Sequence, residues 1–195
     1  MPRPSVKAER TEEILDAFER CVVHYGVDGA TLERIAAEAA LQRSLLRHYI
    51  GNREALIEAL LKRFLKKSAA ETKELFDALP AKQRAAALLD YLFDEQYSDS
   101  QLALVASALI AAAASHDHLR SPLRRWIGHF VDAVAEELQR SFPSVDSAAC
   151  VEVAAGIVGI YFNVESLAPL GRMKTLRTGS KNAAERLIST LGHVG

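Results

Sequence analysis

The chain has 195 residues, a formal net charge of −1, 49% hydrophobic and 25% charged residues, and two cysteines. This composition excludes a disordered or fibrous chain, and the length fits one or two domains that each bury a core. The near-zero net charge provides no overall basic excess, so any nucleic-acid binding must rest on where the charges lie.

Cysteine usage and apolar patterning predict a cytoplasmic protein. Cys21 and Cys150 lie far apart and form no CxxC motif, which favours two buried free thiols in a reducing compartment. The first ten residues are polar and charged, without the apolar region of a secretory signal. The longest apolar stretches, Leu102–Ala114 and Ala148–Phe162, are shorter than the roughly 18 to 20 residues that span a bilayer. We therefore expect buried core helices and no membrane partner.

The residue pattern predicts an all-α fold, because alanine and leucine dominate and no segment shows sustained alternation. The first helix is expected from about residue 10 to 25, with Gly26 as its stop. Thr31 is expected to cap a second helix, and a short break then leads to a third at about Arg43–Ile50. Asn52 is expected to cap a long fourth helix that runs toward Leu79.

Five further helices are predicted beyond Pro80. Proline, glycine and capping residues place them at about 81–96, 100–114, 122–142, 148–167 and 180–191. Ser121–Pro122 is expected to open the seventh helix, and 169–180 is expected to be the longest loop. The chain should thus contain nine helices, with a domain of residues 1–52 followed by a larger helical domain of residues 53–195.

The segment from Thr31 to Ile50 has the form of a helix-turn-helix, whose second helix enters the major groove of DNA. Between Gln42 and Arg53 there are three arginines and no acidic residue, whereas the preceding helix carries Glu33 and Glu38. Arginine suits both phosphates and base edges, so the basic charge is concentrated where a recognition helix needs it. A solvated basic helix on an ordinary bundle is the alternative.

Residues 31–56 resemble the DNA-binding motif of TetR-family transcriptional regulators. The resemblance is carried by Thr31, by Ile35-Ala36, by Leu46, by His48-Tyr49 and by Asn52-Arg53-Glu54-Ala55-Leu56. It extends over about residues 10–60 by motif and over the remainder by length and helix count. One departure is Ala40, which stands where the family usually has a glycine in a left-handed turn.

The resemblance implies roles for individual residues. Thr31, Tyr49 and Arg53 would hold phosphates, Arg43, Ser44 and Arg47 would face bases or flanking phosphates, and Leu45 would meet a thymine methyl group. His48 belongs to the same predicted interface. Arg3, Lys7 and Arg10 lie ahead of the expected first helix and form either a DNA-contacting arm or a frayed charged terminus.

The expected eighth helix is apolar on almost every face, which favours a partner on each side. The resemblance implies a homodimer in which the last two helices pair across a two-fold axis, with Gly156, Gly159 and Ile160 at the interface. A dimer also fits the reading of a pseudo-palindromic operator in double-stranded DNA. A wholly intramolecular apolar helix is the alternative.

The resemblance further implies a pocket for a small-molecule effector in the larger domain, which releases DNA from a repressor. The candidate lining residues are Phe64, Tyr91, Phe93, Trp126, His129, Phe130, Tyr161 and Asn163. Aromatic residues at helical spacing are more often core than ligand contacts, although apolar lining with few polar groups is typical of pockets.

No other site class is favoured, and no cofactor is expected. His116-Asp117-His118 lacks a neighbouring cysteine or second ligand cluster in the sequence, so a polar inter-helix loop is preferred over a metal site. The sequence has no phosphate loop, nucleophile elbow or zinc-protease motif, which argues against an enzyme. The alternative function is a helical protein-interaction module without DNA binding.

Overall fold

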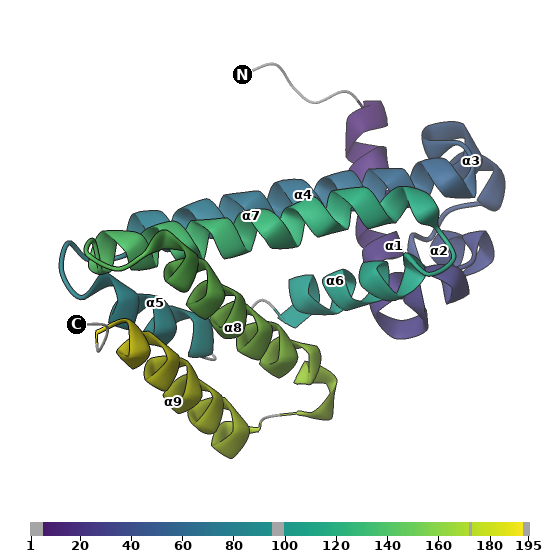
Figure 1. Ribbon diagram of the computed structural model, residues 1–195. Coiled ribbons are helices and arrows are strands. Elements are labelled where there is room, and N and C mark those ends of the chain that lie inside the picture. The colour runs from purple at the N-terminus through teal and green to yellow at the C-terminus, as the bar shows by residue number, and fades with distance from the viewer. Residues whose placement is uncertain (1–5, 95–99, 172, 193–195) are drawn as a thin grey trace. The chain divides into compact units, whose positions relative to one another are not determined.

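The computed structural model describes residues 6–94, 100–171 and 173–192, which contain nine α-helices and no strand (Figure 1). This confirms the all-α prediction. The helices are α1 (Val6–Gly29), α2 (Leu32–Glu38), α3 (Arg43–Ile50), α4 (Arg53–Ala78), α5 (Arg84–Phe93), α6 (Ser100–Ala112), α7 (Asp117–Ser141), α8 (Ser147–Ser166) and α9 (Lys174–Leu191). A 3₁₀ turn, η1 (Ala168–Leu170), follows α8.

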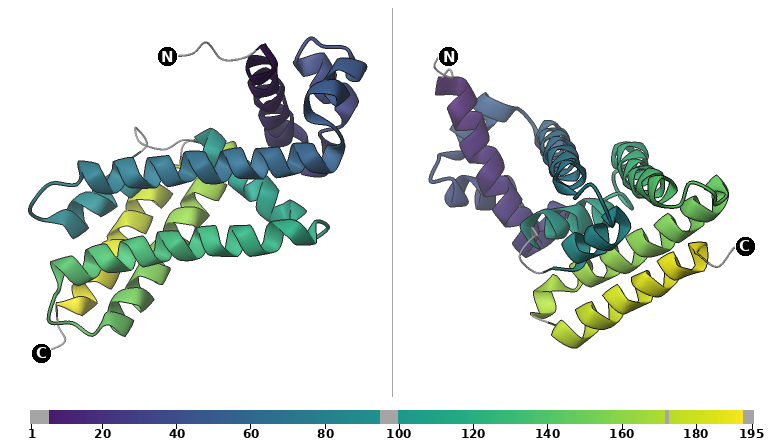
Figure 2. Two further views of the ribbon diagram at one scale, coloured as in Figure 1. Left: turned by 90° about the horizontal axis from the view of Figure 1, so that it is seen from above. Right: turned by 90° about the vertical axis from the view of Figure 1, so that its left-hand side faces the viewer.

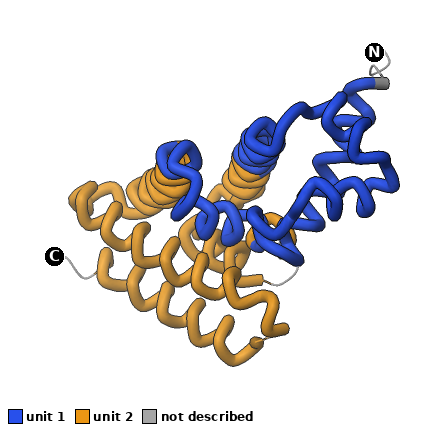
Figure 3. Tube along the Cα trace, turned by 90° about the vertical axis from the view of Figure 1, so that its right-hand side faces the viewer, with its two compact units in different colours: residues 1–67, 104–121 blue, residues 68–103, 122–195 orange. Residues whose placement is uncertain are grey.

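The chain forms two compact units (Figure 3). Unit 1 comprises residues 1–67 and 104–121, and unit 2 comprises residues 68–103 and 122–195. The helices α1 to α3 thus share a unit with the first part of α4 and with the α6–α7 connection. The functional boundary after residue 52 stays a prediction.

Unit 1 has a small apolar core, to which each of its first helices contributes fully buried side chains. Ile14 and Phe18 of α1, Ile35 of α2, Leu46 of α3 and Leu56 of α4 are each 0% exposed. Burial of one such side chain stabilises the fold by roughly 1.5–3 kcal/mol. The short helices α2 and α3 are therefore held by packing more than by their own propensity.

Unit 2 is built around α8, which lies antiparallel beside α9 (Figures 1 and 2). Its apolar core includes Leu88 and Leu89 of α5, Leu138 of α7 and Ile157 of α8. The carboxylate of Glu137, also in α7, is fully buried within this unit. Arg84 donates hydrogen bonds of 2.6 and 2.9 Å to its two oxygens, which lower the pKa of Glu137 below its ordinary value.

The predicted burial of α8 on both sides is not seen within the described chain. The whole helix has 20 residues and is longer than its apolar stretch 148–162, so by length and composition alone it could cross a membrane. Val153, Ala154, Ile157 and Val158 are buried, so one face of α8 packs against the core of unit 2. The opposite face remains exposed, including Val151 at 45%.

The helices α7 and α9 both begin earlier than predicted. The helix α7 begins at Asp117 and includes Pro122. Proline at this position removes one backbone hydrogen bond of the helix. Burial of Leu119 and Leu123 on the same face offsets that loss. The helix α9 begins at Lys174 rather than at Ser180. Its first turn is fixed by Arg177, whose guanidinium lies 2.9 Å from the buried carboxylate of Glu165.

The helix α5 is shorter than predicted. It begins at Arg84 because Gln83 has a φ of 56°, a left-handed conformation that does not continue a helix. It ends at Phe93, where Asp94 is extended, and the predicted end at residue 96 lies outside the described residues.

Candidate nucleic-acid interface

The helix-turn-helix is confirmed by α2 and α3, and local signals set its ends. The backbone N–H of Arg34 donates to Thr31 Oγ1 at 3.3 Å, which caps α2 as predicted. The helix α3 spans the predicted residues and buries Leu46. At the start of α4, Asn52 Oδ1 accepts a 2.8 Å hydrogen bond from the backbone N–H of Ala55, which is the predicted cap.

The turn between α2 and α3 keeps left-handed geometry although it has no glycine. Ala40 has a φ of 52°. Its N–H donates to Ala37 O at 3.2 Å, and the N–H of Leu41 donates to Ala36 O at 2.9 Å. This pair of bonds is the Schellman ending of a helix, in which glycine is the usual left-handed residue. Ala40 therefore carries conformational strain at the turn that orients α3.

We expect Ala40→Gly to raise the free energy of unfolding by roughly 0.5–1 kcal/mol. A left-handed alanine costs about 1–2 kcal/mol, and part of that gain is offset by the larger conformational entropy of an unfolded glycine. Urea unfolding monitored by circular dichroism measures the change. The control is Ala37→Gly, an exposed position inside α2 that should instead lose about 1 kcal/mol. Equal destabilisation by both variants contradicts the prediction.

The outer face of α3 presents a cluster of donors with an apolar contact among them. Arg43, Ser44, Arg47 and His48 are exposed, and Leu45 is 42% exposed. Within the described chain the Arg43 guanidinium pairs with Glu33 of α2. The backbone N–H of Glu33 and then Arg43 hold the pKa of that carboxyl below its ordinary value, so the acid is charged at neutral pH. Binding of Arg43 to DNA thus competes with Glu33.

Tyr49 and Arg53 lie where α3 gives way to α4. Tyr49 is half-buried, with its ring 5.3 Å from that of His48 in an edge-on arrangement. The guanidinium of Arg53 donates to Ala30 O at 2.8 Å and to Val27 O at 2.5 Å. Arg53 therefore stabilises the α1–α2 connection, a role that its sequence context did not reveal, and its contact with phosphate stays a prediction.

The expected N-terminal arm is shorter than predicted. Lys7 and Arg10 lie inside α1, because this helix begins at Val6, and Arg10 donates a 2.6 Å hydrogen bond to Glu13. Arg3 lies outside the described residues. Gly26 interrupts α1 as predicted, with a φ of 69° and a ψ of 171°.

Four of the eight predicted effector-pocket residues come together in unit 2. The Phe93 and Phe130 rings lie 6.3 and 6.0 Å from that of Tyr161, and Phe162, which was not predicted, lies 5.3 Å from Trp126. Burial, followed by the nearby acids Glu165 and Glu71, raises the pKa of Tyr161 well above its ordinary value. We define the aromatic cluster as Phe93, Trp126, Phe130, Tyr161 and Phe162.

The other candidates are placed differently. Phe64 is buried in unit 1, whereas the remaining candidates belong to unit 2. Tyr91 is half-buried beside the core of unit 2, and His129 is exposed. Asn163 lies on the exposed face of α8. The structure therefore does not gather the predicted set into one pocket.

An open groove runs between the outer faces of α8 and α9. Its volume is about 1210 Å³, and its lining includes all three predicted interface residues, Gly156, Gly159 and Ile160, together with Asn163. Gly159 is exposed, and a Cβ atom added at that position would meet no atom within 4 Å in the described chain. The small residues thus leave a shallow apolar surface on α8 and α9.

Comparison with known proteins adds sequence relatives to this geometry. Residues 14–60 match the family described as bacterial regulatory proteins, tetR family. The HTH-type transcriptional regulator BetI of Escherichia coli O17:K52:H18 (strain UMN026 / ExPEC) is 26% identical over 148 residues, which cover 72% of this chain and 75% of that protein. The protein of the same name from Burkholderia thailandensis (strain E264) is 25% identical over 75% of this chain and 66% of its own length.

A solved structure agrees in fold over nearly the whole chain. The TetR transcription regulator from Haloarcula marismortui ATCC 43049 has a TM-score of 0.74 at 17% identity, covering 93% of this chain and 97% of that one. The family match contains α2, α3 and the caps described above, and the fold match extends to the helices that follow. Together these findings support a TetR-family transcriptional regulator whose helix-turn-helix lies within residues 14–60.

Proposed function

We propose that the protein is a cytoplasmic, homodimeric repressor that binds a pseudo-palindromic operator and releases it when a small-molecule effector binds. The observation that carries DNA binding is the outer face of α3. It offers two arginines and no acid, on a helix anchored from behind by the fully buried Leu46. Fixed donors on a packed helix suit the major groove, where arginine reads guanine edges.

The contacts that we propose follow from exposure. Arg43, Ser44 and Arg47 meet base edges or flanking phosphates, and Leu45 meets a thymine methyl group. Thr31 and Tyr49 sit at the start of α2 and the end of α3, where they fit backbone contacts that fix the register. Arg53 contributes to phosphate binding through the guanidinium N–H groups that do not donate to the carbonyls of Val27 and Ala30. His48 adds an exposed ring nitrogen on the same face.

The proposed dimer pairs the outer faces of α8 and α9 with those of a second copy. Support comes from the groove that contains Gly156, Gly159 and Ile160 and from the exposed Val151 on the same helix. Small residues allow helices to approach closely, and an exposed apolar patch of this kind marks an interaction site. Two copies present two recognition helices to half-sites about 34–36 Å apart.

The proposed effector site lies at the aromatic cluster of unit 2. The cluster combines large apolar rings with two polar groups, the Tyr161 hydroxyl and the Trp126 indole, which donates to Ser68 Oγ at 2.6 Å. Such a surface suits a mainly apolar molecule with one or two polar groups. In the proposed mechanism effector binding lowers the affinity for the operator, and DNA lowers the affinity for the effector by the same factor.

Selection from a randomised pool of DNA duplexes tests the proposal and requires no known operator sequence. We expect the purified chain to enrich a sequence with two related half-sites one helical turn apart. Affinity for that duplex should fall steeply with salt, because each neutralised phosphate releases counterions. Recovery of no sequence, or binding that ignores both sequence and salt, overturns the proposal and favours a protein-interaction module.

A further inference from the structure

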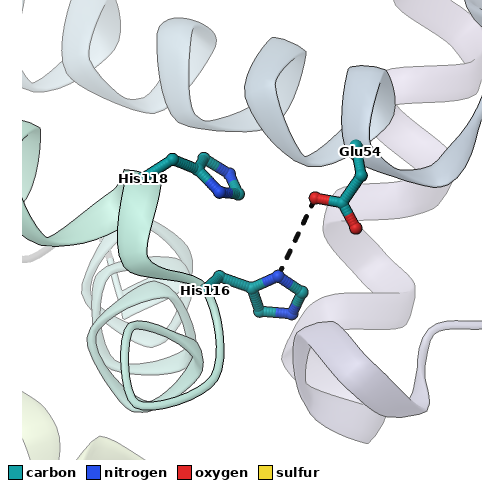
Figure 4. Close-up of side chains that lie close together, drawn as sticks. All are labelled: Glu54, His116 and His118. Atoms are coloured by element: carbon teal, nitrogen blue, oxygen red, sulfur yellow. Dashed lines mark ion pairs between the residues drawn. The ribbon is translucent and has the colours of Figure 1, made fainter.

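We propose that Glu54, His116 and His118 form a binding site for a divalent transition-metal ion of the zinc class (Figure 4). Glu54 stands in the first turn of α4, His116 precedes α7 and His118 lies in its first turn. All three residues belong to unit 1. One ligand atom of each lies within 4.8 Å of the other two. None of the three residues belongs to the outer face of α3 or to the aromatic cluster.

The ligand set suits zinc chemically. Two imidazoles and one carboxylate, with a fourth position left to water, are a common donor set for this ion. Nδ1 of His116 lies 3.9 Å from Oε2 of Glu54, and the rings of His116 and His118 are 5.8 Å apart. Tetrahedral ligands about 2.0–2.1 Å from one ion lie roughly 3.3 Å from each other. Rotation of the exposed side chains of Glu54 and His118 closes the remaining gap.

A fourth residue already orients His116. Asp28 Oδ1 lies 2.9 Å from Nε2 of His116, whose side chain is only 14% exposed. When Nε2 donates to this carboxylate, Nδ1 is left with the lone pair that a metal needs, and it faces Glu54 (Figure 4). A carboxylate behind a ligating histidine is the usual outer-shell arrangement in zinc sites.

Occupancy would join segments that are distant in sequence. The ion would connect the start of α4, which directly follows the recognition helix, to the α6–α7 connection, with the α1–α2 connection behind it. A ligand that binds only the folded state stabilises it by mass action. Zinc should therefore raise the thermal unfolding temperature of the full chain by several degrees at a concentration well above its dissociation constant.

Calorimetric titration of the EDTA-treated, dialysed full chain with ZnCl₂ tests the proposal, and the visible spectrum with CoCl₂ reports the geometry. We expect one ion per chain with a dissociation constant in the micromolar range or below, and tetrahedral Co²⁺ absorption. His118→Ala and Glu54→Gln remove one ligand each, keep the Asp28–His116 contact and should weaken binding at least tenfold. Asp28→Asn should weaken it about 10-fold to 100-fold.

The matched control is His129→Ala, which removes another exposed histidine of α7 and should bind zinc as the parent chain does. Circular dichroism checks that each variant is folded before titration. Absence of one-to-one binding below 100 µM zinc overturns the site. So does binding that His118→Ala and Glu54→Gln leave unchanged, because the ion then sits elsewhere.

Discussion

Replacement of both Arg43 and Arg47 by alanine is expected to weaken binding to the selected duplex by about 100-fold or more. Each arginine that reads a base edge contributes roughly 1–3 kcal/mol of discrimination, and the two lie one helical turn apart on the outer face of α3. Fluorescence anisotropy at several salt concentrations measures the change. The slope of log affinity against log salt should also become shallower by up to about two, because the two removed guanidinium groups no longer neutralise DNA phosphates.

The control for this experiment removes the same charge from another part of the chain. Arg124 and Arg125 of α7 are both exposed in unit 2, and their double alanine variant should bind DNA within about twofold of the parent. If both double variants lose affinity equally, the chain attracts DNA only through its total charge. If neither loses affinity, α3 is not the recognition helix.

Glu33 modulates the same contact. It pairs with Arg43 in the described chain, so Glu33→Gln frees the guanidinium and removes a negative charge from the phosphate-facing side. We expect a severalfold gain in DNA affinity at low salt that shrinks at high salt, because salt screens the interaction between exposed charges on Glu33 and on the DNA. The same anisotropy titration measures it, with Glu38→Gln at the end of α2 for comparison. Unchanged or weaker binding by Glu33→Gln contradicts this expectation.

The helix-turn-helix was predictable because its signals are local. Thr31 and Asn52 cap the helices that follow them, and both positions were identified from residue type and spacing alone. The left-handed turn at Ala40 was implied only by the family resemblance, since alanine itself disfavours that conformation. The recognition face followed from charge placement, which the total of −1 conceals.

Features that depend on distant segments were not predictable in this way. The family resemblance predicts a phosphate contact for Arg53, whereas in the structure its guanidinium donates hydrogen bonds to the backbone carbonyls of Val27 and Ala30. Glu54 and His116 are far apart in the chain, so no spacing rule could connect them. The start of α7 was misplaced because a Ser-Pro pair is a common helix opening, whereas burial of Leu119 extends the helix beyond it.

The partner of the outer face of α8 could not be predicted from sequence. Apolar residues indicate that a surface is buried, but they do not identify what buries it. Val153 and Ile157 are buried within the unit, whereas Val151 and Gly159 are exposed in the single chain. A second copy is the occupant that we propose. Exposure of Gly159 makes this expectation testable without damage to the core.

Gly159→Arg is expected to convert a dimer into a folded monomer. A Cβ atom added at this position meets no atom within 4 Å in the described chain, and the position is exposed, so the variant should fold, but the added charge and bulk obstruct the paired surfaces of α8 and α9. Analytical ultracentrifugation should give the parent chain twice its 21.3 kDa mass and give the variant that mass alone. Affinity for the two-half-site duplex should fall on the order of 100-fold, because a monomer loses the second, intramolecular contact.

The matched control is Gly128→Arg in α7, where an added Cβ atom also meets no atom within 4 Å in the described chain. It makes the same change in charge and helix propensity away from α8 and α9, so it should leave both the mass and the DNA affinity near the parent values. A parent chain that sediments at 21.3 kDa refutes the dimer directly. A Gly159→Arg variant that remains dimeric places the interface elsewhere, because a cation buried without a partner at a close helix crossing is too costly to keep.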